Sequence, residues 1–174
     1  MSNLPNNYVY RQDVIDFVTV AVETCLLFEH VAELEKHDFV EKALAYLPLL
    51  YVRTRALPQP EEQIDGFLQT FVSEDDYNFV REGVSQLLGP DDVFLEVFVE
   101  DMRYSDEPVS AFVSENMADI YQELKDMAAN FQLQDEEVMT AAVANCLESF
   151  HMHWGQKLLN TLRPLHAMAE TNAE

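Results

Sequence analysis

The chain has 174 residues, of which 48% are hydrophobic, and it carries a formal net charge of −22 at pH 7. This length predicts a single domain, and no stretch approaches the roughly 20 apolar residues of a membrane span, which excludes an integral membrane protein. The start, MSNLPNNYVYRQD, lacks the basic and apolar regions of a secretory signal, so the sequence favours a cytoplasmic protein.

The low glycine content, 4 residues, favours long helices over tight turns. A first helix is predicted over Tyr10–Ala32, where apolar residues recur at steps of three and four. Further apolar residues widen this stripe, which is typical of a helix at the centre of a bundle. A second helix is predicted over 39–57, with Asp38 as its N-cap, Glu41 at the capping-box position and a kink at Pro48.

Residues 58–72 carry two prolines and predict a loop that contains a short helix. A third helix follows, because Ser73 has the character of an N-cap and Asp76 stands three residues later. Gly89 and Pro90 supply the signals that end this helix.

An extended segment is predicted after the third helix. The sequence VFLEVFV at 93–99 is short and rich in β-branched and aromatic residues, and 109–113 can pair with it. The charged stretch EDMRYSDEPVS at 100–110 would then form the loop of a hairpin. Because an isolated hairpin is marginally stable in water, this one is expected to lie against the helices.

Two helices complete the chain. Ser114 is predicted to cap the fourth, and Asp135 the fifth, which is expected over 136–163 and to end or bend at Pro164. Gly155 lies in the middle of the fifth helix, where glycine costs about 1 kcal/mol relative to alanine. We expect it to allow close approach of a neighbouring helix, with the indole of Trp154 packed beside it.

The predicted fold class is all-α, a bundle of about five main helices with a short extended or β-hairpin insertion around residues 92–113. Residues 1–170 are expected to form a single helical domain, followed by a disordered tail at 171–174. Cys25 and Cys146 both fall on apolar helical faces and are predicted to be buried and unpaired.

The sequence contains no glycine-rich phosphate loop, no G-x-S-x-G elbow and no H-E-x-x-H pair. Glu148 and His151 have the E-x-x-H spacing of di-iron bundles, but no second copy occurs. Glu123 and Asp126 match half of the magnesium site of all-α pyrophosphatases, without the E-x-x-E that should precede it. We therefore expect no metal and no cofactor, and favour a role without catalysis.

Three segments together resemble a known family: LPLLY at 47–51, the stretch 91–126 that contains YSDEPVS, and WGQKLLNTLRPLH at 154–166. The family is bacterial and is known only as domain of unknown function 5063. The resemblance spans nearly the whole chain and implies a mostly helical, cytoplasmic domain. It implies no activity and no catalytic residue.

The negative charge is concentrated in the middle of the sequence. Residues 61–137 hold 21 acids and 3 bases, whereas 1–60 hold 8 and 5, and 138–174 hold 3 and 2. Such a surface repels nucleic acids and anionic membranes and attracts basic proteins or cations. An acidic surface that only keeps the protein soluble is the alternative.

The favoured hypothesis is a non-catalytic protein-interaction module that binds a basic partner, in an oligomeric state that the sequence leaves open. Arginine, tyrosine and tryptophan dominate interface energetics, and acids beside them would recruit basic groups. The candidate binding residues are Asp101, Arg103, Tyr104, Asp106, Glu107 and Trp154. The alternative for Arg103 and Tyr104 is a structural role, in which they attach the hairpin to the bundle.

Two other functions stay open. One is a metal-dependent or small-ligand enzyme that uses carboxylates between helices, although Glu115, Asp119, Glu123 and Asp126 fall mostly outside the apolar stripe of their helix. The other is an acidic mimic of nucleic acid that occupies the DNA groove of a basic protein, which requires acids spaced like phosphates along one surface.

Repulsion among the central acids predicts how stability depends on salt and pH. The repulsion opposes folding and is screened within roughly 8–10 Å at physiological salt, so the melting temperature should be higher in 0.5 M than in 0.02 M sodium chloride. Crowded carboxyls have raised pKa values, and such groups stabilise the fold when protonated. The melting temperature should therefore also be higher at pH 5.5 than at pH 8. A melting temperature that falls with added salt would show acids paired with bases instead.

Overall fold

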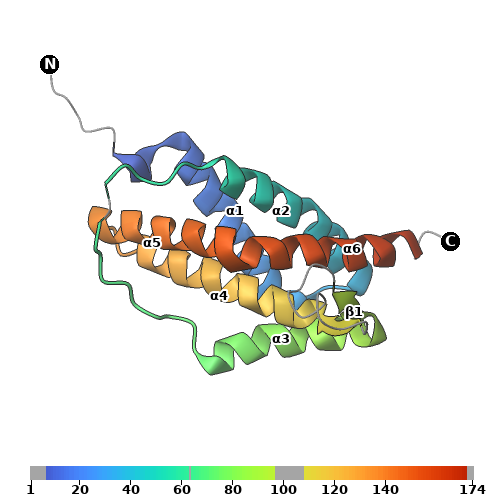
Figure 1. The fold of residues 1–174 in the computed structure, drawn as a ribbon. Helices are drawn as coiled ribbons and strands as arrows, with labels where there is room; N and C mark the ends of the chain where they lie inside the picture. The colour runs from blue at the N-terminus through green and yellow to red at the C-terminus, as the bar shows by residue number, and fades with distance from the viewer. Residues whose placement is uncertain (1–6, 63, 97–107, 172–174) are drawn as a thin grey trace, which may run out of the picture.

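The computed structural model describes residues 7–62, 64–96 and 108–171. Helices that run lengthwise form a bundle, and a pair of short strands lies at one end of it (Figure 1). The prediction of an all-α bundle with a β-hairpin insertion is confirmed. The main elements are α1 Gln12–Glu29, α2 Lys36–Ala56, α3 Glu74–Leu88, β1 Val93–Glu96, β2 Val109–Phe112, α4 Val113–Phe131, α5 Glu136–Ser149 and α6 Gly155–Thr171.

The centre of the bundle is α4, which contacts α1, α3, α5 and α6. Its consecutive residues Asn116, Met117 and Ala118 are all buried. Successive helical side chains point about 100° apart, so this burial requires neighbours on several sides. The first helix, for which the sequence predicted the central place, instead leaves Ile15 and Leu26 exposed.

The first two helices differ from their predicted bounds. α1 ends at Glu29, and the short 3₁₀ turn η2, Val31–Glu33, separates it from α2. α2 begins at Lys36, so Asp38 lies in its first turn and is not its N-cap, and no side chain caps the actual N-cap, Glu35. An acid in the first turn is stabilised by the helix dipole, which makes it look like a cap in the sequence.

Neither proline inside the long helical patterns ends its helix. α2 continues through Pro48 to Ala56, and α6 continues through Pro164 to Thr171. Buried Leu50 follows Pro48, and buried Leu165 follows Pro164. Each helix thus keeps contributing to the core beyond its proline, and this burial offsets the lost backbone hydrogen bond.

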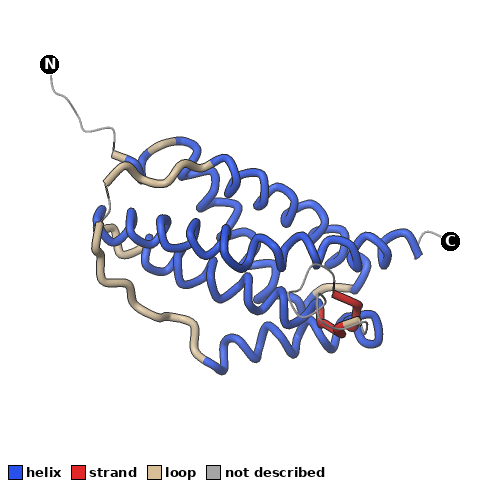
Figure 2. The backbone as a smooth tube through the Cα atoms, in the orientation of Figure 1, coloured by secondary structure: helices blue, strands red, loops and turns tan. Residues whose placement is uncertain are grey.

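The connection from α2 to α3 holds no helix in its described part, contrary to prediction. It runs as a loop at the end of the bundle opposite to the hairpin (Figure 2). Side chains of α4 bind its backbone. Asp126 Oδ1 accepts from the backbone N–H groups of Phe71 at 2.7 Å and Val72 at 2.8 Å. The Asn130 amide bonds both the N–H and the C=O of Gln69. These contacts satisfy backbone groups that a helix would otherwise satisfy.

Two predicted helix caps are confirmed. The Ser73 side chain accepts from the backbone N–H of Asp76, and the Asp76 carboxylate accepts from the backbone N–H of Ser73, which completes a capping box at the start of α3. Asp135 accepts from the N–H groups of Glu137 and Val138 at the start of α5. Gly89 ends α3 with a φ of 56°, a conformation that glycine adopts without strain.

The predicted cap of α4 was wrong. Ser114 lies inside the first turn of α4, and Asp92, which precedes β1, supplies the cap from across the hairpin. Its Oδ1 accepts from the backbone N–H of Ser114 at 2.7 Å, and its Oδ2 accepts from Ser114 Oγ at 2.7 Å. Asp92 is buried. One carboxylate thus closes the base of the hairpin, where Val93 pairs with Phe112, and begins the central helix.

Replacement of Asp92 with alanine should therefore destabilise the fold strongly. The change removes a helix cap and leaves the buried N–H of Ser114 without its acceptor, which should lower the free energy of unfolding by about 2 kcal/mol. Urea unfolding measures this value. Asp91→Ala is the matched control, because Asp91 only forms an exposed ion pair with Lys36. Equal effects of the two substitutions would contradict the capping role.

Candidate interaction surface

Five of the six candidate binding residues, Asp101, Arg103, Tyr104, Asp106 and Glu107, lie outside the described residues. The strands that lead into and out of their segment are described. β1 ends at Glu96 and β2 begins at Val109, and the two pair antiparallel in the predicted hairpin. The described surface next to this segment therefore consists of the hairpin itself and the helices under it.

Trp154, the sixth candidate, is a core residue. Its side chain is 1% exposed, and its indole N–H donates to the backbone carbonyl of Cys146 at 3.1 Å. Its ring meets that of Phe150 edge to face, with centroids 4.7 Å apart. Its position gives a partner no access, so the proposed surface does not include it.

The backbone around Trp154 explains the neighbouring glycine. Residues Phe150–Trp154 form a π-helical turn between α5 and α6, in which the N–H of Gly155 donates to the carbonyl of Phe150. A Cβ at position 155 would lie 2.7 Å from that carbonyl oxygen and 2.9 Å from the Phe150 ring. The close approach that glycine permits is thus to its own chain, and not to a neighbouring helix as predicted.

The hairpin presents an apolar face to solvent. Side chains alternate between the two faces of a strand, and Phe94 and Ala111 point toward the bundle. Val93, Leu95 and Phe112 point away from it, with exposed fractions of 50%, 60% and 38%. Val93 lies directly opposite Phe112, and Leu95 lies opposite exposed Ser110. We call Val93, Leu95, Ser110 and Phe112 the hairpin face.

The hairpin rests on the bundle through both polar and apolar contacts. Asn160 of α6 donates to Glu96 at 3.3 Å, and Phe94 packs against the core. The N-terminal end of α4, the C-terminal half of α3 and Phe112 of the hairpin line a cavity of about 310 Å³. This cavity is lined by Arg81, Glu82, Ser85, Gln86, Asp92, Phe112, Ser114 and Glu115.

Arg81 lies in this cavity with part of its hydrogen-bonding capacity unused. Its Nε is buried and has no hydrogen-bond partner among the described residues. Its Nη2 lies 3.7 Å from Glu82, an exposed and long ion pair of small energetic value. Arg81, Glu82 and Glu115 thus line this cavity together with Phe112 of the hairpin face.

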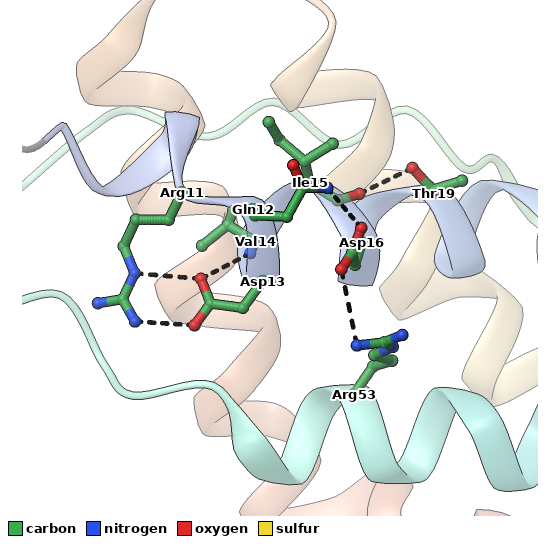
Figure 3. A network of polar contacts seen from close by, with 8 residues as sticks. All are labelled: Arg11, Gln12, Asp13, Val14, Ile15, Asp16, Thr19 and Arg53. Atoms are coloured by element: carbon green, nitrogen blue, oxygen red, sulfur yellow. Dashed lines mark hydrogen bonds and ion pairs between the residues drawn. The ribbon is translucent and has the colours of Figure 1, made fainter.

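Ion pairs neutralise only a small part of the acidic charge. Arg11 binds Asp13 through two hydrogen bonds, and Arg53 of α2 lies 3.6 Å from Asp16 of α1 (Figure 3). Within the described ranges, six bases form such pairs. The chain has 32 acids and 10 bases, so most carboxylates have no basic partner. The chain as a whole therefore keeps a strongly negative net charge.

The residues considered for metal binding form no complete site in the described part of the chain, although Glu123 and Asp126 line one cavity. Glu148 and His151 are both exposed. His151 Nδ1 lies 3.1 Å from the cationic Nη1 of Arg55, and a positive charge so close to the ring disfavours metal binding there. Across residues 7–62, 64–96 and 108–171, no three His, Cys, Asp or Glu side chains are arranged to hold a metal ion. In the same ranges, no helix is long and apolar enough to cross a membrane.

Both cysteines are buried and unbonded, as predicted. Burial raises the pKa of the Cys25 thiol to about 12, and it raises the pKa of Cys146 well above its usual value. The thiolate that nucleophilic catalysis needs is thus disfavoured at both positions.

Comparisons with known proteins agree with this arrangement. Residues 8–170 match the family described as domain of unknown function, DUF5063. The chain belongs to the DUF5063 family. The crystal structure of protein BF1032 from Bacteroides fragilis is 35% identical, with a TM-score of 0.81 over 92% of this chain and 94% of that one. The search of curated proteins gave no match.

The π turn of this DUF5063 domain generates a prediction about Gly155. In most helices glycine to alanine stabilises by about 1 kcal/mol. Here the new Cβ would collide with a backbone oxygen, so Gly155→Ala should instead destabilise by about 1–3 kcal/mol. Thermal and urea unfolding of the variant test the sign. A stabilised variant would mean that the turn relaxes to a regular helix without cost.

Proposed function

We propose that this DUF5063 domain is a non-catalytic protein-interaction module that binds a basic partner protein through its hairpin face. One observation carries the proposal: Val93, Leu95 and Phe112 form a single exposed apolar face on a strand pair. Single exposed apolar residues are ordinary, but grouped ones indicate an interaction surface, because water disfavours them together.

Charge supports a basic partner over a second copy of the chain. Two copies would each bring a net charge of −22 to a shared interface. The segment between the strands adds Glu100, Asp101, Asp106 and Glu107 to the sequence next to the hairpin face. Opposite charges would steer a basic partner to this face and raise its association rate.

The strands supply a second means of contact. Among the described residues, β1 and β2 form a two-stranded sheet, so each strand pairs on one side only. An unpaired strand edge can accept an extended segment of another protein through backbone hydrogen bonds. A partner segment that alternates apolar and basic side chains would cover the apolar face and meet the acids together.

The enzyme alternative lacks comparable support. Two of the four carboxylates of α4 that could have formed a site are used elsewhere: Asp119 accepts from Tyr77 and Lys157, and Asp126 accepts from the loop backbone. No arrangement in the described residues favours the nucleic-acid mimic.

The test is affinity capture from a native lysate, followed by identification and purification of the captured proteins. Leu95→Asp places a charge in the middle of the hairpin face without disturbing the core. Leu133→Asp, at an exposed position in the turn after α4, is the control with the same change of charge. Equal melting temperatures for the two variants would confirm that both fold.

We expect basic proteins to be captured by the wild type and by Leu133→Asp, and lost with Leu95→Asp. For a purified partner, the loss of one central apolar contact should weaken binding by roughly tenfold or more. Tyr104→Ala and Asp106→Lys extend the test to the segment between the strands. Capture that Leu95→Asp leaves unchanged, or a captured set without basic proteins, would reject the proposal.

A further inference from the structure

A second cavity lies between α1, α3, α4 and the end of the α2–α3 loop, away from the hairpin. Its volume is about 350 Å³. It is lined by Glu29, Phe71, Val72, Asp76, Phe79, Tyr121 and Lys125. α3 connects the two regions, because its first half lines this cavity and its second half lines the one beneath the hairpin. The residues of the hairpin face take no part in it.

Two lining residues of this cavity, Glu29 and Lys125, form an ion pair in which their charges cancel. Glu29 Oε1 accepts from the Tyr121 hydroxyl at 2.9 Å and from Lys125 Nζ at 2.7 Å. The hydrogen bond to Glu29 raises the pKa of Lys125, so this amine stays protonated at neutral pH. The positive charge of Lys125 is thus compensated by Glu29.

The sides of the cavity carry two exposed aromatic rings. Phe71 is 40% exposed and Phe79 is 58% exposed. The backbone of Phe71 is fixed by Asp126, and Phe79 lies on α3, so both rings stand on well-anchored backbone. Neither ring stacks on another aromatic ring within the described residues. Their exposure leaves part of each ring accessible to a ligand.

Asp76 supplies a charge that forms no ion pair among the described residues. Its hydrogen bonds with Ser73 lower its pKa, and the charge of Lys125 helps to lower it. This direction is opposite to the one expected for a crowded acid, so Asp76 is ionised at neutral pH. Both bonds go to Oδ2, and Oδ1 accepts no hydrogen bond from the described residues. With Glu29 and Lys125 paired, Asp76 leaves the cavity with a net negative charge beside two aromatic faces.

A cation on an apolar stem matches these features. Aromatic faces attract cations through their quadrupole, and a guanidinium also stacks on rings and pairs with a carboxylate in a planar geometry. We propose that this cavity binds the side chain of an arginine from a partner protein, stacked on Phe71 and Phe79 and paired with Asp76. The proposal does not depend on the hairpin face, which other residues form.

The first experiment is an NMR titration with N-acetyl-arginine N-methylamide. The matched probe is the citrulline analogue, which has the same shape without the charge. We expect saturable shifts of Phe71, Phe79 and Tyr121 signals with the arginine probe, and at least tenfold weaker binding of the citrulline probe. Lysine and spermidine probes should bind more weakly than arginine. Equal binding of arginine and citrulline, or no saturable shift, would overturn the proposal.

The second experiment uses substitutions that spare the core. Phe79→Ala should weaken arginine binding roughly fivefold, as expected for one lost cation–π contact. Phe67→Ala should leave binding unchanged, because Phe67 is 83% exposed on the same loop and does not line the cavity. Equal effects of these two variants would place the probe elsewhere and refute the proposal.

Two variants that each remove one negative charge test the role of Asp76 separately. Asp76→Asn keeps an oxygen that can accept from Ser73 but removes the charge, and should weaken the arginine probe severalfold. Asp75→Asn removes the same charge one residue away, outside the lining, and should have little effect. If Asp75→Asn weakens binding as much as Asp76→Asn, general attraction by the acidic surface explains the shifts and the site does not exist.

Discussion

The structure depends on the enclosure of α4. A helix with neighbours on several sides must find partners for its buried polar groups inside the protein, because an unsatisfied buried group costs about 1–3 kcal/mol. α4 meets much of this requirement through hydrogen bonds to Asp92, α1, α3, α6 and the α2–α3 loop, whereas Asn116 Nδ2 has no hydrogen-bond partner among the described residues. The contacts are Ser114 to Asp92, Asp119 to Tyr77 and Lys157, Tyr121 and Lys125 to Glu29, Asp126 to the loop backbone, and Asn130 to Gln69.

The same contacts place both proposed binding regions. Asp92 holds the base of the hairpin against the start of α4, and this fixes which strand face turns toward solvent. Asp126 holds Phe71 beside Phe79 at the other end of α3. The buried residues of α3, Val80, Val84 and Leu88, pack in the core. The other faces of α3 can therefore line the two cavities. An acidic surface with apolar and aromatic contact points at both ends of α3 suits a basic partner that extends along the bundle.

Local rules predicted the elements whose energetics are local. The capping box of Ser73 and Asp76, the cap at Asp135 and the glycine that ends α3 each need only a few adjacent residues. The local rules failed where a group far away in the sequence took the role of a nearby one. Ser114 looks like a cap, but a carboxylate 22 residues earlier takes that role. Pro164 was expected to end or bend its helix, but the helix continues to Thr171 with Leu165 buried beyond the proline.

By itself, the sequence determined the helical class, the hairpin, the burial of both cysteines and the concentration of acid in residues 61–137. Each of these follows from periodicity or composition, which are properties of the chain alone. Only the tertiary structure decided which helix is central, that Trp154 is enclosed, and that Phe71 and Phe79 share a cavity with Glu29 and Asp76. The residues of this cavity come from three stretches of the chain, Glu29, 71–79 and 121–125, and no spacing in the sequence encodes how these stretches meet. They meet because α4, which contains 121–125, lies against the other two and bonds to Glu29 through Tyr121 and Lys125 and to the loop backbone through Asp126.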